Sequence, residues 1–151
     1  MTGGARYVHT SLVARDWQSL AKFYESLFGC VRVPPEREYS GDALNAGTGI
    51  PNSVLRGVHL RLPGHGAEGP TLEIFGYSRL SESLPPVVNR PGLAHLAFEV
   101  PSVGDAREQV LAAGGNAVGE IVTLATADGR HVTWCYVTDP EGNIIELQSW
   151  E

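Results

Sequence analysis

The chain has 151 residues, the length of one average domain and enough to bury a core without disulfide or metal staples. Hydrophobic residues make up 42 % and charged residues 19 %, which argues against a disordered or fibrous chain. The formal net charge of −6 and the lack of a basic run argue against a nucleic-acid-binding protein. Since no targeting segment or membrane span is visible, we expect a cytoplasmic protein with no membrane partner.

The first half of the chain predicts a strand, a helix and further strands. A strand over Tyr7–Val13 precedes a helix that Asp16 caps, and Gly29 ends that helix. The helix has an apolar stripe at i, i+3, i+4 and i+7 spacing: Trp17, Leu20, Ala21, Tyr24, Leu27 and Phe28. Three strands follow, the first of them weak: Cys30–Val33, Val54–Leu62 and Thr71–Tyr77. Pro34–Ser53 is rich in glycine and proline, and we expect a long functional or mobile loop there.

The second half repeats this plan after a linker over Arg79–Pro91. A strand over Leu93–Val100 precedes a helix that begins with the capping pair Ser102 and Asp105 and ends at Gly114-Gly115. The strands that follow are a weak one and two stronger ones: Ala117–Thr123, Val132–Thr138 and Ile144–Trp150. Each half therefore reads β-α-β-β-β, which predicts one domain over 1–151 with modules at about 5–78 and 92–150, joined by the linker 79–91.

Four polar residues occupy matching places in the two halves. His9 and His95 each lie in the strand before a helix, and Glu73 and Glu146 each lie in the last strand of a half. All four interrupt apolar strands whose other face must meet the helices. Because side chains alternate along a strand, each polar group should point away from the helix-covered core.

Such a set of side chains favours a metal site. A carboxylate in an apolar strand is costly unless it is solvated, paired or bound to a metal. Two histidines and two carboxylates suit a divalent ion of the Mn, Fe, Co, Ni or Zn series. Taken singly, a strand glutamate is explained by solvent exposure and a strand histidine by a structural role. The agreement of four residues in two half-repeats favours the metal site.

Other polar residues are weaker candidates. His59 and His131 lie in or beside strands and could reach the same cavity, although the pattern does not fix their faces. His65 and Glu141 fall in loops and should be solvated, and Glu99 lies at a strand end, behind the ligands at best. Cys30 and Cys135 lack metal spacing and should be buried thiols. The sequence shows neither a phosphate-binding loop nor a nucleophile elbow.

Three segments of the chain resemble a known family. They are HTSLVARD from His9 to Asp16 with the helix that follows, GLAHLAF from Gly92 to Phe98, and DPEGNIIEL from Asp139 to Leu147. Together they are similar to the glyoxalase/bleomycin resistance/dioxygenase proteins of the vicinal oxygen chelate superfamily. The resemblance covers about Tyr7 to Trp150.

This resemblance implies an α+β fold of two tandem βαβββ modules, whose mixed sheet forms an open cup with helices outside. It implies one divalent metal ion (Ni, Co, Zn, Mn or Fe) held by His9, Glu73, His95 and Glu146. Extradiol dioxygenases of the family lack a ligand at the position of Glu73, and drug-sequestering bleomycin-resistance relatives lack the ligands. The pattern is closest to the glyoxalase I and methylmalonyl-CoA epimerase branch, although the basic residues that bind glutathione have no match.

The resemblance also implies a reaction. A substrate with vicinal oxygens would chelate the metal, and proton transfer would pass through an enediolate or enolate, as in an isomerase, lyase or epimerase. We expect Glu146 to be ligand and general base, with Glu73 as the alternative, and the two histidines to coordinate only. The open alternatives are an extradiol-type dioxygenase, an antibiotic-resistance thiol transferase and a non-catalytic drug-binding protein. A homodimer is expected by analogy with relatives.

Overall fold

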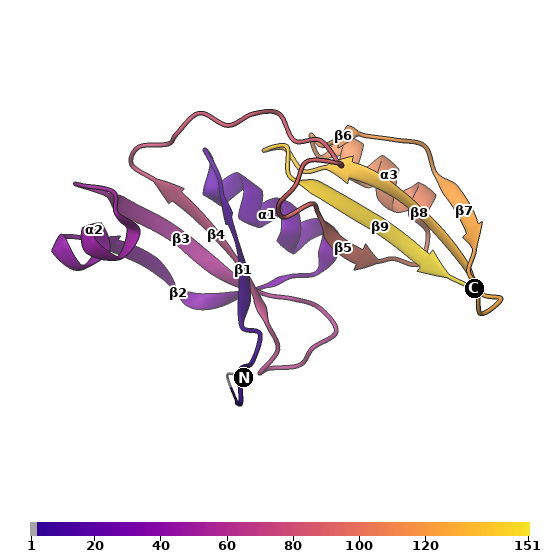
Figure 1. Cartoon of the computed structure of the whole chain (residues 1–151), viewed down its shortest axis with the longest axis horizontal. Helices are drawn as coiled ribbons and strands as arrows, with labels where there is room; N and C mark the ends of the chain where they lie inside the picture. The colour runs from indigo at the N-terminus through magenta and orange to yellow at the C-terminus, as the bar shows by residue number, and fades with distance from the viewer. Residues whose placement is uncertain (1–2) are drawn as a thin grey trace. The chain divides into compact units, whose positions relative to one another are not determined.

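The computed structural model describes residues 3–151. The chain divides into two compact units, Met1–Glu82 and Ser83–Glu151, so the division falls inside the segment expected to be a linker. Each unit combines one mixed sheet with a helix that covers it (Figure 1). The predicted α+β class with tandem modules is confirmed.

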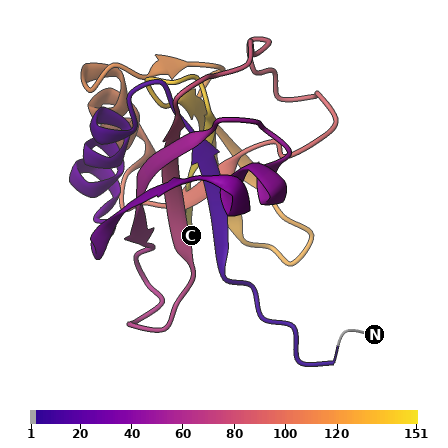
Figure 2. The same cartoon turned by 90° about the vertical axis from the view of Figure 1, so that its left-hand side faces the viewer.

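The first unit contains four strands and two helices. In chain order these are β1 (His9–Val13), α1 (Trp17–Phe28), β2 (Val31–Ser40), α2 (Asp42–Thr48), β3 (Val54–Arg61) and β4 (Thr71–Tyr77). The strand order is β1-β4-β3-β2, with β1 parallel to β4 and the other pairs antiparallel. Helix α1 packs on β3 and β4 and covers one face of the sheet (Figure 2). The other face is left for polar side chains.

The second unit repeats this arrangement with one more short strand. Its elements are β5 (Leu96–Glu99), α3 (Val103–Ala112), β6 (Asn116–Ala117), β7 (Val122–Ala125), β8 (His131–Thr138) and β9 (Ile144–Trp150). The strand order is β5-β9-β8-β6, and β7 also pairs with β8. Strand β5 is parallel to β9, as β1 is to β4, and α3 packs on β8 and β9.

Both long helices begin where the sequence predicts, and α1 also ends there. The Asp16 carboxylate accepts the amide N–H of Ser19 at 3.0 Å and so satisfies a free donor of the first turn. Gly29 ends α1 in the left-handed conformation, φ 67°, which a residue without Cβ adopts at little cost. The Ser102 hydroxyl accepts from the amide of Asp105 and caps α3 in the same way.

Each sheet buries one face against its helix. On β4, Leu72 and Ile74 are fully buried while Glu73 between them is not, and on β9 Ile145 and Leu147 flank Glu146 likewise. Burying one large aliphatic side chain contributes about 1.5–3 kcal/mol, so a register slip of one residue would be costly. The apolar neighbours therefore fix the side of the sheet on which each glutamate stands, as the alternation predicts.

Three local predictions were wrong. Pro34–Ser53 is not a long loop, because β2 continues to Ser40 and α2 follows. Pro34 and Pro35 are tolerated since β2 is an edge strand whose register shifts between Val33 and Arg37. The weak strand expected over 117–123 is two short strands, β6 and β7, and β5 begins only after His95. Within residues 3–151 no helix has the length and apolar character to cross a membrane.

Candidate functional site

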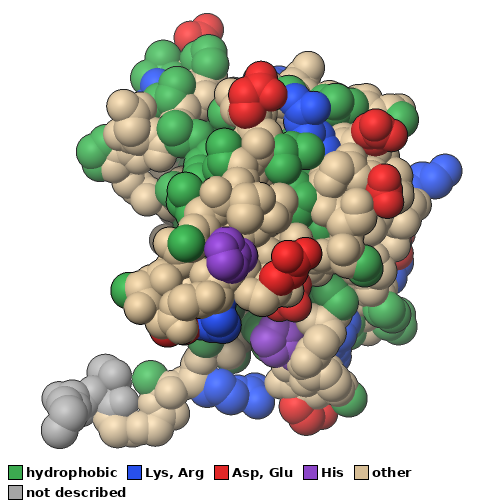
Figure 3. All heavy atoms as spheres, turned by 90° about the vertical axis from the view of Figure 1, so that its right-hand side faces the viewer, with side chains coloured by type: hydrophobic (Ala, Val, Ile, Leu, Met, Phe, Trp, Pro, Cys, Tyr) green, Lys and Arg blue, Asp and Glu red, His purple; other side chains and the backbone are tan. Residues whose placement is uncertain are grey.

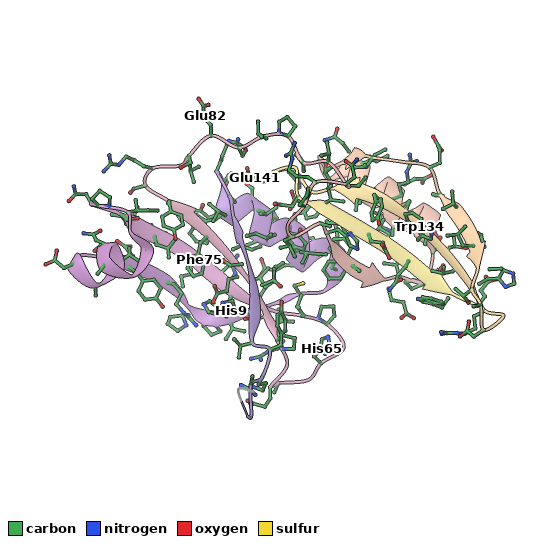
Figure 4. The ribbon with its side chains drawn as sticks, viewed as in Figure 1. His9, His65, Phe75, Glu82, Trp134 and Glu141 are labelled. Atoms are coloured by element: carbon green, nitrogen blue, oxygen red, sulfur yellow. The ribbon has the colours of Figure 1, made fainter. Side chains whose placement is uncertain are left out.

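In the first unit a histidine and a glutamate meet on the sheet face away from α1. Glu73 lies in the middle of β4 and pairs with Ser11 of the parallel strand β1. His9 is two residues before Ser11, hence on the same face, and its Nδ1 lies 3.4 Å from Glu73 Oε1. Figure 4 shows His9 projecting from β1.

A second histidine contacts the same carboxylate. His59 on β3 is directly opposite Glu73, and its Nε2 lies 3.2 Å from Glu73 Oε1. Its ring packs edge-on against Phe75, with 5.8 Å between centroids. Burial lowers the pKa of His59 below its ordinary 6.5; the charge of Glu73 opposes this, whereas Arg37 and His9 add to it. His59 is therefore a neutral imidazole at neutral pH and can donate one hydrogen bond.

The second unit places an equivalent pair by the same register. Glu146 on β9 pairs with Ala97 of the parallel strand β5, and His95 is two residues before Ala97. The His95 Nε2 lies 3.3 Å from Glu146 Oε2. The spacing that relates His9 to Glu73 thus relates His95 to Glu146, which is what an internal repeat predicts.

Tyr136 takes the position that His59 has in the first unit. It lies opposite Glu146 on β8, and its ring centroid is 5.1 Å from that of His95. Burial raises the pKa of Tyr136, and the charge of Glu146 and a hydrogen bond to it raise the pKa further. Trp134, labelled in Figure 4, continues this aromatic row at 5.0 Å from Tyr136.

The two carboxylates are held largely out of solvent. The side chain of Glu73 is 13 % exposed and that of Glu146 is 19 % exposed. A carboxylate so placed needs a compensating partner, and on the face that no helix covers Glu73 has two imidazole nitrogens beside it and Glu146 has one. Imidazole and carboxylate are ligands that divalent transition metals accept, so the donor chemistry fits the expected ion.

The structure brings the four predicted residues together as two pairs, one in each unit. Within residues 3–151 no group of three or more His, Cys, Asp or Glu side chains is arranged as a metal site. In the first unit, His9 and His59 both contact the same oxygen of Glu73, Oε1, at distances typical of hydrogen bonds.

The weaker candidates separate clearly. His59 does face the predicted site, whereas His131 begins β8 on the side of the buried Cys135 and Val137. His65 is exposed in the loop between β3 and β4, as Figure 4 also shows, and Glu99 is exposed at the end of β5. Both cysteines are buried and free, and burial raises the pKa of Cys30 to about 12.

Two residues of these faces were missed by the sequence reasoning. The alternation of Trp134 and Tyr136 with buried residues on β8 was a usable signal for Tyr136. Arg37 was hidden in the segment expected to be a loop. It lies on β2 opposite Gly57, two residues along β3 from His59, and so on the face of Glu73.

The comparisons with known proteins identify the family of this chain. Residues 6–147 match the model of the Glyoxalase/Bleomycin resistance protein/Dioxygenase superfamily. The chain belongs to this superfamily. The resemblance found in the sequence is thereby confirmed. No curated protein matches the chain.

Solved structures of the superfamily share the fold. A glyoxalase family protein from Bacillus cereus has a TM-score of 0.83 at 18 % identity, covering 99 % of this chain and 98 % of that one. One from Enterococcus faecalis has a TM-score of 0.59 at 21 % identity, covering 98 % and 99 %. A fosfomycin resistance protein from Listeria monocytogenes, solved with Mn(II) and sulfate, has a TM-score of 0.52 at 16 % identity, covering 99 % and 93 %. At these identities the likeness is one of fold.

Proposed function

We propose that this superfamily member is a divalent-metal-dependent enzyme that moves a proton between adjacent carbons of a small oxygenated substrate. The observation that carries the proposal is the repeated register: each unit sets a histidine two residues before the strand partner of a glutamate. A single pair of this kind would be explained by a structural contact. Two at equivalent places, both on the face away from the helices, support a shared role.

His9, Glu73, His95 and Glu146 would hold the ion. A bound ion of the Ni, Co, Zn, Mn or Fe type supplies a positive charge that stabilises negative charge developing on substrate oxygens. Two carboxylates and two neutral imidazoles balance the charge of a dication. In this role His9 and His95 only coordinate, and each imidazole lies beside the glutamate that would share the ion with it.

Glu146 is the residue we assign to proton transfer, with Glu73 as the alternative. The Tyr136 hydroxyl hydrogen-bonds to Glu146. Glu73 instead has two histidines on one oxygen and is more constrained. A carboxylate that takes a proton from one carbon and returns it to the next performs an isomerase, lyase or epimerase reaction on a substrate with vicinal oxygens.

Metal binding is the first test. Protein purified without chelator should contain one divalent ion per chain, and titration calorimetry of stripped protein should show one site for Ni, Co, Mn or Zn. His9→Ala and His95→Ala should each weaken binding by more than about 100-fold, since removal of a group behind the ligands already costs 10- to 100-fold. His65→Ala, in the exposed loop, is the matched control. Unchanged affinity in the His9 and His95 variants would refute the site.

The reaction is tested by solvent deuterium exchange at the carbon beside a carbonyl. Metal-loaded protein should catalyse exchange into an α-hydroxyketone, a hemithioacetal or an acyl thioester. Oxygen consumption with a catechol and Fe(II), without exchange, would favour a dioxygenase instead. Binding of an apolar drug without either reaction would favour a sequestering protein.

We also propose a cytoplasmic homodimer. Strands β1, β2 and β5 end their sheets, and such edges are commonly covered by a partner. Light scattering should return about twice the 16.2 kDa mass of the chain. A species of 16.2 kDa alone at micromolar concentration would contradict the dimer.

A further inference from the structure

Arg37 stands beside the Glu73 cluster on the open face of the first sheet. Its strand partner is Gly57, which pairs in turn with Phe75 on β4. Because Gly57 has no side chain, nothing from β3 stands on this face between Arg37 and Phe75. From strand geometry the Cα atoms of Arg37 and His59 are about 8 Å apart, within reach of a long side chain.

The guanidinium of Arg37 lacks a partner at a buried nitrogen. Its Nη1 is buried and has no hydrogen-bond partner in the part of the chain that the structure describes. The other arginines of β2 and β3 are bonded: Arg32 to Glu25 and Glu36, Arg56 to Glu38, and Arg61 to the carbonyl of Gly69. A buried charged donor left unsatisfied is costly. Arg37 is therefore the group on this face that most needs an acceptor.

We propose that Arg37 binds an oxyanion group of the ligand, a carboxylate or a phosphonate, beside the half-site formed by His9 and Glu73. The proposal rests on the proposed function for the place of the ligand's chelating oxygens, and it adds the substrate class. The ligand is then a small acid with vicinal oxygens at one end and an anionic group at the other.

The chemistry of the neighbours favours an anion. A guanidinium is always charged and presents paired N–H donors that match two oxygens of a carboxylate or phosphonate. Arg37 lies on this face, because its strand partner Gly57 is two residues along β3 from His59. The nearest carboxylate of the cluster, Glu73, already has both histidines on it. Phe75 beside it supplies an apolar flank that limits competition by water.

Hydroxamates give a matched test on the metal-loaded protein. Acetohydroxamate offers two vicinal oxygens without an anion, whereas malonate monohydroxamate and phosphonoacetohydroxamate add a carboxylate or a phosphonate. At least one anionic probe should bind about 10- to 100-fold more tightly than acetohydroxamate, because a charged hydrogen-bonded pair forms. Arg37→Met should abolish this preference and leave acetohydroxamate affinity unchanged, and Arg37→Lys should keep part of it. The control is Arg56→Met, whose guanidinium is bonded to Glu38.

A second arm needs no metal and no variant. In stripped wild-type protein, methylphosphonate or acetate should shift the NMR signals of the Arg37 guanidinium and leave those of Arg56 in place. If metal and acetohydroxamate fail to bind but these shifts appear, the proposed function fails and the role of Arg37 stands. If acetohydroxamate binds and neither anionic probe gains through Arg37, the role of Arg37 is refuted and the proposed function stands. If the Arg37 guanidinium signals do not shift, the role of Arg37 is refuted, whether or not acetohydroxamate binds.

Discussion

The two units repeat one backbone frame but differ in what stands beside the shared histidine–glutamate pair. In the first unit the neighbours are His59 and Arg37, which are polar or charged. In the second they are Tyr136 and Trp134, and the exposed apolar residues of β7 lie alongside them. The space-filling view from the side of the second unit shows hydrophobic side chains among separate small groups of acidic and basic ones (Figure 3).

This difference separates the positions that the two units share from the positions at which they differ. The histidine–glutamate pairs have the same strand register in both units, and that register fixes where each pair stands. The residues opposite each glutamate on the next strand, His59 and Tyr136, have diverged. The units therefore differ in the residues beside the pairs, which are polar or charged in the first unit and aromatic in the second.

The largest expected effect is a difference in exchange rate between variants of the two glutamates, Glu146 and Glu73. Glu146→Gln should lower the rate of deuterium exchange by ~10²- to 10⁴-fold while keeping much of the substrate affinity, because general-base catalysis contributes that much. Glu73→Gln should lower it less at saturating metal, since the proposed assignment gives proton transfer to Glu146 and metal coordination to Glu73. Exchange kinetics on both metal-loaded variants measure this. Equal losses in rate would show that the two carboxylates are not divided in this way.

Alanine substitutions in the cores behind the two glutamates should lower the free energy of unfolding by similar amounts. Leu72 and Leu147 are fully buried neighbours of Glu73 and Glu146. Replacing either with alanine leaves a cavity, so the free energy of unfolding should fall by about 2–5 kcal/mol. Urea unfolding followed by circular dichroism gives both values. A loss below 1 kcal/mol in one variant would indicate that its helix does not pack as the structure has it, and Leu84→Ala, at an exposed leucine, is the control.

The diverged neighbours should differ in their effect on the metal. His59→Ala removes a group that contacts Glu73, so metal affinity should fall by about 10- to 100-fold. Tyr136→Phe removes only a hydroxyl from Glu146 and should cost less. Calorimetric titration of stripped protein with Zn or Mn distinguishes them. The opposite ranking would place the more important supporting residue in the second unit.

The smallest expected effect concerns Cys30. Burial raises its pKa from 9.0 to about 12, so the unfolded chain loses this proton at a lower pH than the folded one. The associated stability is complete below pH 9 and is lost as the pH rises toward 12. Because a single proton is involved, this loss is at most about 1.4 kcal/mol per pH unit. Unfolding of wild type and Cys30→Ala between pH 8 and 10.5 should diverge accordingly; parallel curves would contradict the raised pKa.

The sequence predicted much of this arrangement because its strongest signals are local. The caps at Asp16 and Ser102 and the alternation around Glu73 and Glu146 depend on neighbours within a few residues. These signals were enough for the helices, the sheet faces and the candidate pairs. The convergence of all four ligands on one ion stays a prediction.

The path of β2 was beyond such reasoning. Pro34 and Pro35 normally interrupt a strand, and only the tertiary position of β2 at a sheet edge makes them acceptable. Since Arg37 follows them, its place on the open face could not be read from local pattern. The partner of His59 was hidden for a similar reason, because cross-strand register is set by pairing between distant segments.

Gly57 limits how the open face of the first sheet could be changed by design. A Cβ at this position would lie 2.1 Å from the backbone oxygen of Ile74 and 2.5 Å from the Phe75 ring. Any larger residue would push β3 from β4 and disturb the cross-strand contact of His59 with Glu73. A variant library that probes the proposed anion site should therefore randomise Arg37 at the sheet edge and keep position 57 invariant.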